Sequence, residues 1–219
     1  MKNKNNIIRF IVYISEIIFF IIFLILLKNQ VLIKWIFIFL AGFLLSPLFG
    51  RFYCGWICPI NTIFKPIDFV YRKMKIDRLR TPSFLKSKII RFIFLFSFIL
   101  LFIITKILKI KLNILLYVIG LATLITLFFE EELWHKHLCP YGSMLSIASK
   151  KSLKRLNIDE KKCIGCGMCQ KICPTNTIIT LDSKKRKILS SECLMCFECQ
   201  KICPTNAITL KNTIKVHVK

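Results

Sequence analysis

The stretch that decides the fold is CIGCGMCQKICP at residues 163–174, and it returns thirty residues later as CLMCFECQKICP at residues 193–204. Each copy spaces four cysteines as Cys-x2-Cys-x2-Cys-x3-Cys and places a proline after the fourth. Three thiols at intervals of three residues can wrap one compact metal centre, whereas the longer last step carries the fourth thiol away from it. The proline fixes the backbone φ angle and ends the loop. Eight of the 11 cysteines are used in this way, so the C-terminal part is expected to bind metal through thiolates.

The spacing is that of the bacterial two-cluster ferredoxin motif, in which the fourth cysteine of each copy binds the other [4Fe–4S] cluster. A zinc ribbon is disfavoured because zinc takes only four ligands per site, and a disulfide knot is disfavoured because disulfides do not persist in the cytoplasm. Short β-prone runs at 178–181, 187–189, 208–210 and 213–218 fit the small sheet of this fold. The motif assigns cluster I to Cys163, Cys166, Cys169 and Cys203, and cluster II to Cys173, Cys193, Cys196 and Cys199.

Ahead of residue 150 the chain has the composition of a membrane protein. Hydrophobic residues make up 55% of the sequence and the mean hydropathy is +0.62. Four apolar blocks, at residues 7–27, 31–49, 89–107 and 112–129, are long enough to span a bilayer, which takes about 20 helical residues. The first block is followed by polar residues without a small-residue cleavage site, so it is expected to be a retained anchor. The predicted fold is a four-helix transmembrane domain at residues 1–149 and an α+β two-cluster ferredoxin domain at residues 150–219.

The distribution of charge predicts the orientation. The chain has 34 Lys and Arg against 11 Asp and Glu, a formal charge of +23. Twenty basic residues lie in the N-terminus, the loop 50–91 and the segment 130–162, whereas five lie in the two alternate connections. Because positive loops stay in the cytoplasm, a multi-pass protein of the cytoplasmic membrane is expected, with both termini and the ferredoxin domain on the cytoplasmic side.

The same excess of positive charge limits the kinds of partner that the chain is expected to bind. High charge combined with long apolar blocks favours anionic lipid headgroups over nucleic acid. The ferredoxin domain is itself basic, with fifteen Lys and Arg against five Asp and Glu. An acidic redox protein such as a flavodoxin or a soluble ferredoxin is therefore the other candidate partner.

Three further cysteines lie in two related motifs of the membrane part. CGWICP at 54–59 and HLCPYG at 137–142 place Cys58 and Cys139 before prolines, 81 residues apart. Aligning these prolines sets His135 opposite Cys54, so a parallel duplication about an axis along the membrane normal is predicted. The set could bind a third cluster, zinc or copper, its thiols could relay electrons, or its cysteines could pack as small apolar side chains. Its members are Cys54, Cys58, Cys139 and His135.

Glu16 is the single acidic residue inside an apolar block. A carboxylate within a membrane is costly, so Glu16 is a candidate for taking a quinol proton. The alternative is that Glu16 faces another helix and pairs with a hydroxyl or a base.

Four apolar blocks, two Cys-Pro motifs and the two-cluster motif together resemble the membrane-bound polyferredoxins. These include the quinol-dehydrogenase ferredoxin subunit of periplasmic nitrate reductase systems and the membrane regulator of nitrous oxide reductase. Family members commonly carry Cys-x3-Cys-Pro in both halves, whereas here His135 stands at the first cysteine position of the second half. The resemblance implies two [4Fe–4S] clusters, with a quinone or an additional metal as candidate further cofactors.

The resemblance also implies an electron-transfer subunit rather than a stand-alone enzyme. Such a subunit passes electrons between the membrane or quinone pool, or a cytoplasmic donor, and a partner reductase. One alternative is a metal-ion or disulfide reductase acting through Cys54, Cys58 and Cys139, which would turn over a metal ion without a partner. The other is a redox-sensing assembly or regulatory membrane protein, which would keep its function after loss of the clusters.

Overall fold

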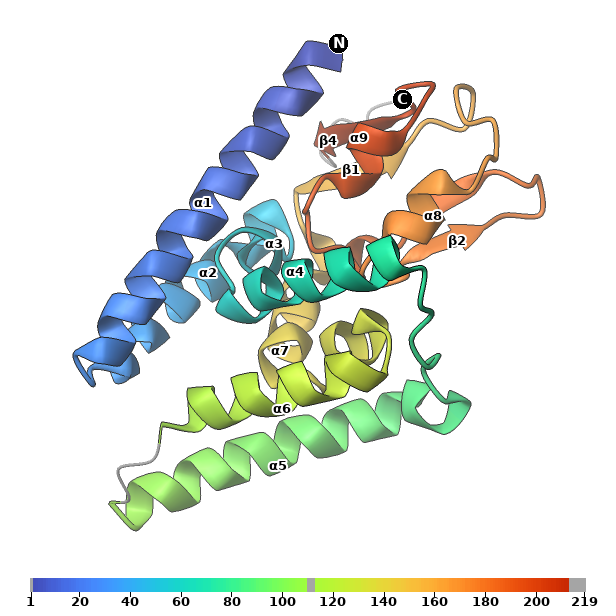
Figure 1. The fold of residues 1–219 in the computed structure, drawn as a ribbon. Coiled ribbons are helices and arrows are strands. Elements are labelled where there is room, and N and C mark those ends of the chain that lie inside the picture. The colour runs from blue at the N-terminus through green and yellow to red at the C-terminus, as the bar shows by residue number, and fades with distance from the viewer. Residues whose placement is uncertain (1, 110–112, 213–219) are drawn as a thin grey trace.

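In the computed structural model, which describes residues 2–109 and 113–212, long helices carry a small mixed domain at one end (Figure 1). The first half of α1 runs beside that domain, and α9 of the domain contacts α1. The helices of the larger part are α1 (Lys2–Lys28), α2 (Trp35–Phe49), α3 (Phe52–Trp56), α4 (Pro59–Met74), α5 (Lys88–Ile107), α6 (Ile114–Phe128) and α7 (Pro140–Ala148).

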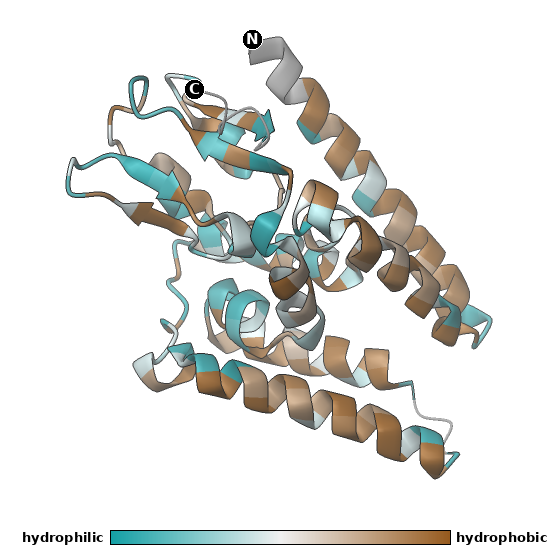
Figure 2. Ribbon diagram, turned by 180° about the vertical axis from the view of Figure 1, so that it is seen from behind, coloured by the Kyte–Doolittle hydropathy of each residue, from teal (hydrophilic) through white to brown (hydrophobic). Residues whose placement is uncertain are grey.

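Within the described residues, three segments are long and apolar enough to cross a membrane: Ile7–Lys28, Leu32–Phe49 and Lys88–Ile107. Large side chains on them, such as Phe37 and Phe96, are 69% and 68% exposed, as expected for surfaces that face lipid. Figure 2 shows that the long helices are hydrophobic along most of their length. The chain is thus a membrane-associated protein. The fourth apolar helix, α6, has 15 residues and is about 22 Å long, short of a hydrocarbon core of about 30 Å. The count of four spans therefore stays a prediction.

In its described residues, up to 212, the mixed domain has two antiparallel strand pairs and two short α-helices. The expected runs near 178, 187 and 208 form strands, whereas the run at 213–218 lies outside the described residues. One strand, β1, was not expected, although Leu156 and Ile158 alternate toward the core. The pairs are β1 (Lys154–Ile158) with β4 (Ile208–Asn212) and β2 (Ile178–Thr180) with β3 (Arg186–Ile188), and the helices are α8 (Met168–Ile172) and α9 (Glu198–Ile202).

The two Cys-Pro motifs fold alike. In the first half a short helix, α3, precedes Cys58, and in the second half a π-helical turn, Leu133–Leu138, precedes Cys139. Cys58 has φ −66° and ψ 120°, and Cys139 has φ −67° and ψ 114°. In both motifs the following proline opens a helix, α4 or α7, where its fixed φ suits the first helical position. The local geometry of the two halves therefore agrees with the predicted duplication.

Candidate functional site

The eight motif cysteines surround two separate cavities. One cavity is lined by Cys163, Cys166, Cys169 and Cys203, together with apolar side chains of β1 and β4. The other is lined by Cys173, Cys193, Cys196 and Cys199, together with apolar side chains of β1, β2 and β3. These are the two sets that the motif assigns to cluster I and cluster II, and each takes its fourth cysteine from the other copy.

The residues around these cavities fit cubane clusters better than single ions. Among the described residues, no three His, Cys, Asp or Glu side chains converge on a point that one metal ion could occupy. In a [4Fe–4S] cluster each thiolate binds a different iron, so the four sulfurs stand farther apart than the ligands of one ion. The apolar walls also suit a cluster, whose potential depends on burial and on hydrogen bonds to sulfur.

Hydrogen bonds to the crossing thiols differ between the two sites. The Sγ of Cys173 lies 3.4 Å from the Thr177 hydroxyl and 3.6 Å from the Thr175 hydroxyl. The Sγ of Cys203 has the Thr205 hydroxyl at 3.7 Å and accepts from the backbone N–H of residue 207 at 3.3 Å. A threonine hydroxyl, that of Thr177, thus contacts the crossing thiol where the second copy has an alanine.

The backbone of the two cysteine loops is bent at equivalent positions. Gly165 and Gly167 take φ of 73° and 76° in the first copy, where glycine carries no penalty. Thirty residues later Met195 and Phe197 take φ of 56° and 61°. Large side chains in this left-handed region are uncommon and mark strain held by the surrounding structure.

The second cysteine loop is docked against α3 of the helical part. The Trp56 Nε1–H donates to the Met195 carbonyl at 2.9 Å, and the Trp56 ring packs edge-on against Phe197 at 6.2 Å. At Gly55 an added Cβ would lie 2.2 Å from the Leu194 carbonyl oxygen, so only glycine allows this approach. These contacts bring the cluster II loop next to the first Cys-Pro motif.

A buried ion network fixes the same interface. Arg51 is fully buried, and its guanidinium contacts Glu192 at 2.7 Å and donates to the His135 carbonyl at 2.9 Å. Arg91 contacts the other Glu192 oxygen at 2.7 Å, and the Ser146 hydroxyl donates to it at 2.8 Å. Burial raises the pKa of the Glu192 carboxyl, but the two arginines outweigh burial and hold that pKa below its ordinary value. In the sequence analysis Arg51 and Arg91 count only among the basic residues of the loop 50–91, and their ion pairs with Glu192 are not predicted.

The three remaining cysteines are buried near one another, with Cys54, Cys58 and Cys139 only 3–8% exposed. Burial raises the pKa of the Cys58 thiol, and the neighbouring Cys54 and Cys139 raise it further. Burial likewise raises the pKa of Cys139 to about 12, so these thiols are neutral at pH 7. The Arg51 guanidinium lies 4.0 Å from the Cys54 Sγ.

The metal site formed by Cys54, Cys58, Cys139 and His135 stays a prediction. In the parts of the chain that the structure describes, no three His, Cys, Asp or Glu side chains lie close enough together to bind one metal ion, at this set or at the motif cysteines. The His135 ring packs against Phe64, with centroids 5.2 Å apart. Burial lowers its imidazole pKa to about 3, so it is neutral.

Glu16 pairs with a base, as one of the two sequence hypotheses stated. Its carboxylate is buried, forms an ion pair with Lys65, and accepts from the Asn61 side chain at 3.4 Å. Both partners lie on α4, so the pair ties α1 to α4. A proton-transfer role for Glu16 has no further observation behind it.

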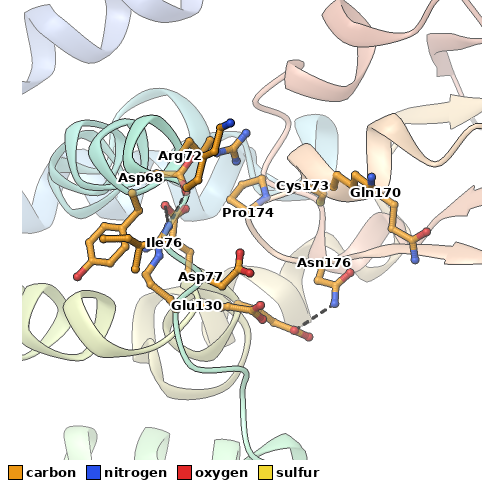
Figure 3. A pocket seen from close by; sticks show the side chains of 15 residues that line it. Asp68, Arg72, Ile76, Asp77, Glu130, Gln170, Cys173, Pro174 and Asn176 are labelled. Carbon is orange, nitrogen blue, oxygen red and sulfur yellow. Dashed lines mark hydrogen bonds and ion pairs between the residues drawn. The ribbon is translucent and has the colours of Figure 1, made fainter.

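A polar groove separates α4 from α8 (Figure 3). Its volume is about 480 Å³, and acidic side chains alternate with basic ones along it. Arg78 bridges Asp68 at 2.5 Å and Glu131 at 3.6 Å, and Asn176 donates to Glu132 at 3.2 Å across the groove. The groove therefore forms a second, weaker attachment between the cysteine motifs and the helical part.

Family models match most of these features. A model described as a 4Fe-4S binding domain matches residues 31–77 and 112–159, and one described as a 4Fe-4S dicluster domain matches residues 155–204. The first two segments begin 81 residues apart, which is also the separation of Cys58 from Cys139. The match therefore agrees with the internal duplication.

Curated proteins are similar to the chain over about three fifths of its length. Uncharacterized protein MJ0749 of Methanocaldococcus jannaschii is 30% identical over 146 residues, covering 64% of this chain and 58% of that protein. The methylamine utilization ferredoxin-type protein MauN of Methylorubrum extorquens is 29% identical over 144 residues, covering 60% and 50%. The ferredoxin-type protein NapH of Haemophilus influenzae is 28% identical over 146 residues, covering 61% and 51%.

The chain thus spans between half and three fifths of the length of these relatives. No solved structure matches it significantly. The cysteine cavities and the two family models agree on an iron–sulfur protein, and the relatives include ferredoxin-type proteins. The chain belongs to the polyferredoxin family of ferredoxin-type proteins.

Proposed function

We propose that the chain is a membrane-anchored electron-transfer protein with two [4Fe–4S] clusters. In this function it passes electrons between the membrane or quinone pool, or a cytoplasmic donor, and a partner reductase. The observation that carries the proposal is the pair of four-cysteine cavities, each closed by a thiol from the other copy. Cluster I is assigned to the first cavity and cluster II to the second.

The clusters supply reversible one-electron transfer when bound, and the chain's own residues set its route. Trp56 and Gly55 hold the cluster II loop against α3, next to Cys54. Arg51 contacts both Glu192, beside Cys193, and the Cys54 thiol. This continuity supports a path from the clusters into the membrane part. Since Cys54, Cys58 and Cys139 are buried, a relay role is better supported than reduction of an external metal ion or disulfide.

An apolar cavity supports a quinone at the membrane end of this path. It measures about 260 Å³, lies between α2, α5, α6 and α7, and is walled by Trp35, Phe39, Phe98, Phe102 and Tyr141. The Tyr141 ring packs edge-on against Phe39 at 5.0 Å and Phe98 at 5.3 Å, two residues after Cys139. Filling the cavity with Phe98→Trp should remove co-purifying quinone without loss of iron. Equal quinone content in variant and native protein would refute this assignment.

Anaerobically purified protein should contain about eight iron and eight labile sulfide per chain. Cys173→Ala should then damage the distant site: amide hydrogen exchange should rise in the loop 193–199, not in the adjacent loop 163–169. Cys203→Ala is the matched variant and should give the opposite pattern. Stoichiometric zinc without sulfide, or exchange that rises only next to the substituted residue, would overturn the assignment.

The proposed topology places both termini and the central loop in the cytoplasm. A reporter that needs the cytoplasm should be active when fused after the last residue, and one that needs export should be active at Asn29. The short α6 makes a fusion within the connection near residue 109 informative as well. An inactive export reporter there, together with an active one at Asn29, would show that α5 and α6 do not form a pair of spans.

A further inference from the structure

The two cluster cavities differ in what surrounds them. Residues 191–198, which include the cluster II cysteines Cys193 and Cys196, form hydrogen bonds and ion pairs with α1, α3, α5 and α7. Arg9 of α1 donates to the Cys196 carbonyl at 3.2 Å and also pairs with Glu198. The helical part therefore covers cluster II on the side of α3.

The loop 161–168, which carries three cluster I cysteines, is held by its own domain. The N–H of Cys163 donates to the Asp159 carbonyl at 3.0 Å, and the β2–β3 turn lies against the loop. An added Cβ at Gly165 would meet the Lys184 carbonyl at 2.7 Å, and one at Gly167 would meet the Arg186 guanidinium at 3.3 Å. Loop and turn project away from the helices in Figure 1.

The cluster I loop also exposes one of its ligands. Cys166 is exposed, Ile164 beside it is 67% exposed, and Met168 is 40% exposed. In the second copy Leu194 takes the position of Ile164, and it is only 2% exposed. The same motif thus has an open, partly apolar tip at cluster I and a covered tip at cluster II.

Positive charge rims the open tip. Lys161, Lys162 and Lys184 are exposed, and Arg186 lines the cluster I cavity. Segments 159–168 and 182–187 together carry six Lys and Arg against three Asp and Glu. Complementary charge of this kind accelerates encounter with a negatively charged protein and fixes its orientation.

Resting on the proposed function, we propose that the tip at Cys166 is the docking surface for a soluble, acidic one-electron carrier protein. Cluster I then exchanges electrons with the carrier, and cluster II connects cluster I to the membrane part. One electron passes between the carrier's redox group and cluster I, so one is oxidised and the other reduced, and no bond is formed or broken. Anionic lipid is the competing occupant of the basic rim, but the tip projects away from the apolar helices.

The test uses full-length protein in nanodiscs and a reduced flavodoxin as the acidic probe. Lys162→Glu and Lys184→Glu together should slow bimolecular cluster reduction at least about tenfold at low salt, and the effect should shrink with added salt. The matched control is Lys201→Glu, an exposed charge reversal on α9, combined with Lys211→Glu on β4. Zero-length crosslinks to flavodoxin carboxylates should map to Lys161, Lys162 and Lys184.

Two outcomes would overturn the inference. One is equal slowing by the control pair with crosslinks spread over the domain. The other is unchanged reduction of the tip variant while its binding to vesicles of anionic lipid falls, which would assign the rim to membrane. In either case about eight iron per chain would leave the two-cluster proposal standing, whereas absent clusters would refute that proposal first.

Discussion

Replacing Glu192 by Gln should loosen the attachment of the ferredoxin domain to the helical part. The Glu192 carboxylate lies between two guanidiniums, Arg51 and Arg91, each at 2.7 Å. Its side chain is 12% exposed, and that of Arg51 is fully buried. A glutamine keeps the shape and the Ser146 contact but leaves two cations facing a neutral amide.

The cost follows from that burial. Removing one member of a buried ion pair costs about 3–5 kcal/mol, because the remaining charge stays desolvated. Glu192 retains some exposure, so the lower end, about 3 kcal/mol, is expected. Since 1.4 kcal/mol is a factor of ten, the population of undocked molecules should rise roughly 150-fold.

Amide hydrogen exchange of the segments 51–57 and 190–198 reports this population, because these two segments contact each other across the docked interface. Exchange limited by undocking should accelerate roughly 150-fold in Glu192→Gln, from the same free-energy difference. Asp182→Asn is the matched control, since Asp182 is an exposed acid of the same domain on the β2–β3 turn. A surface change of this kind should alter stability by less than about 0.5 kcal/mol.

The reasoning would be refuted if Glu192→Gln exchanged no faster than Asp182→Asn. Arg91→Gln provides a second reading if the first variant is poorly expressed. The Arg91 side chain is 17% exposed, and replacing it leaves the ion pair between Arg51 and Glu192 intact. A smaller acceleration of amide exchange in the same segments is therefore expected. Acceleration confined to other parts of the ferredoxin domain would contradict the interface.

Three further variants test the site. Gly55→Ala should undock the domains at a cost of about 1–3 kcal/mol, because the new Cβ meets the Leu194 carbonyl oxygen 2.2 Å away; native exchange rates in both segments would contradict this. Thr177→Ala removes a hydrogen bond to the Cys173 sulfur, so the cluster II potential should become more negative by potentiometric titration, with cluster I unchanged. Burial, with a contribution from Asp68, raises the pKa of the Glu131 carboxyl to about 8. Between pH 4.5 and 8 Glu131 therefore keeps its proton in the folded state and loses it in the unfolded state. The stability of the fold consequently falls as the pH rises through this window. Glu131→Gln should abolish that part of the pH slope of the thermal midpoint, and an unchanged slope would contradict it.

The grouping of the eight motif cysteines around two cavities was the most predictable feature, because it follows from a fixed local spacing that needs no tertiary information. The docking of the domains was not predictable. Arg51 is one of the basic residues that predict the orientation of the chain in the membrane, and an arginine in a loop is ordinarily exposed to solvent. Its partner Glu192 is 141 residues away, and only the fold brings the two together.

Other differences also have physical causes. The second Cys-Pro motif adopts a π-helical turn where the first has an α-helix, a difference that the shared proline positions do not predict. The His135 ring in this turn packs on Phe64. The strand β1 was missed because five residues carry only a brief alternation, and its register depends on β4, fifty residues later in the chain.

The differences between the two near-identical cysteine motifs explain why the second loop, and not the first, packs against α3. Both need left-handed backbone at two positions, and the first copy meets this with Gly165 and Gly167. The second copy uses Met195 and Phe197, at about 1–2 kcal/mol of backbone strain each. These side chains are 5% and 4% exposed, and burying each contributes about 1.5–3 kcal/mol, which offsets the strain. Part of this burial comes from the helical part, where Trp56 packs against Phe197. The bulky residues therefore make the cluster II loop dependent on the docked core, whereas the glycines leave the cluster I loop stable and open to a partner.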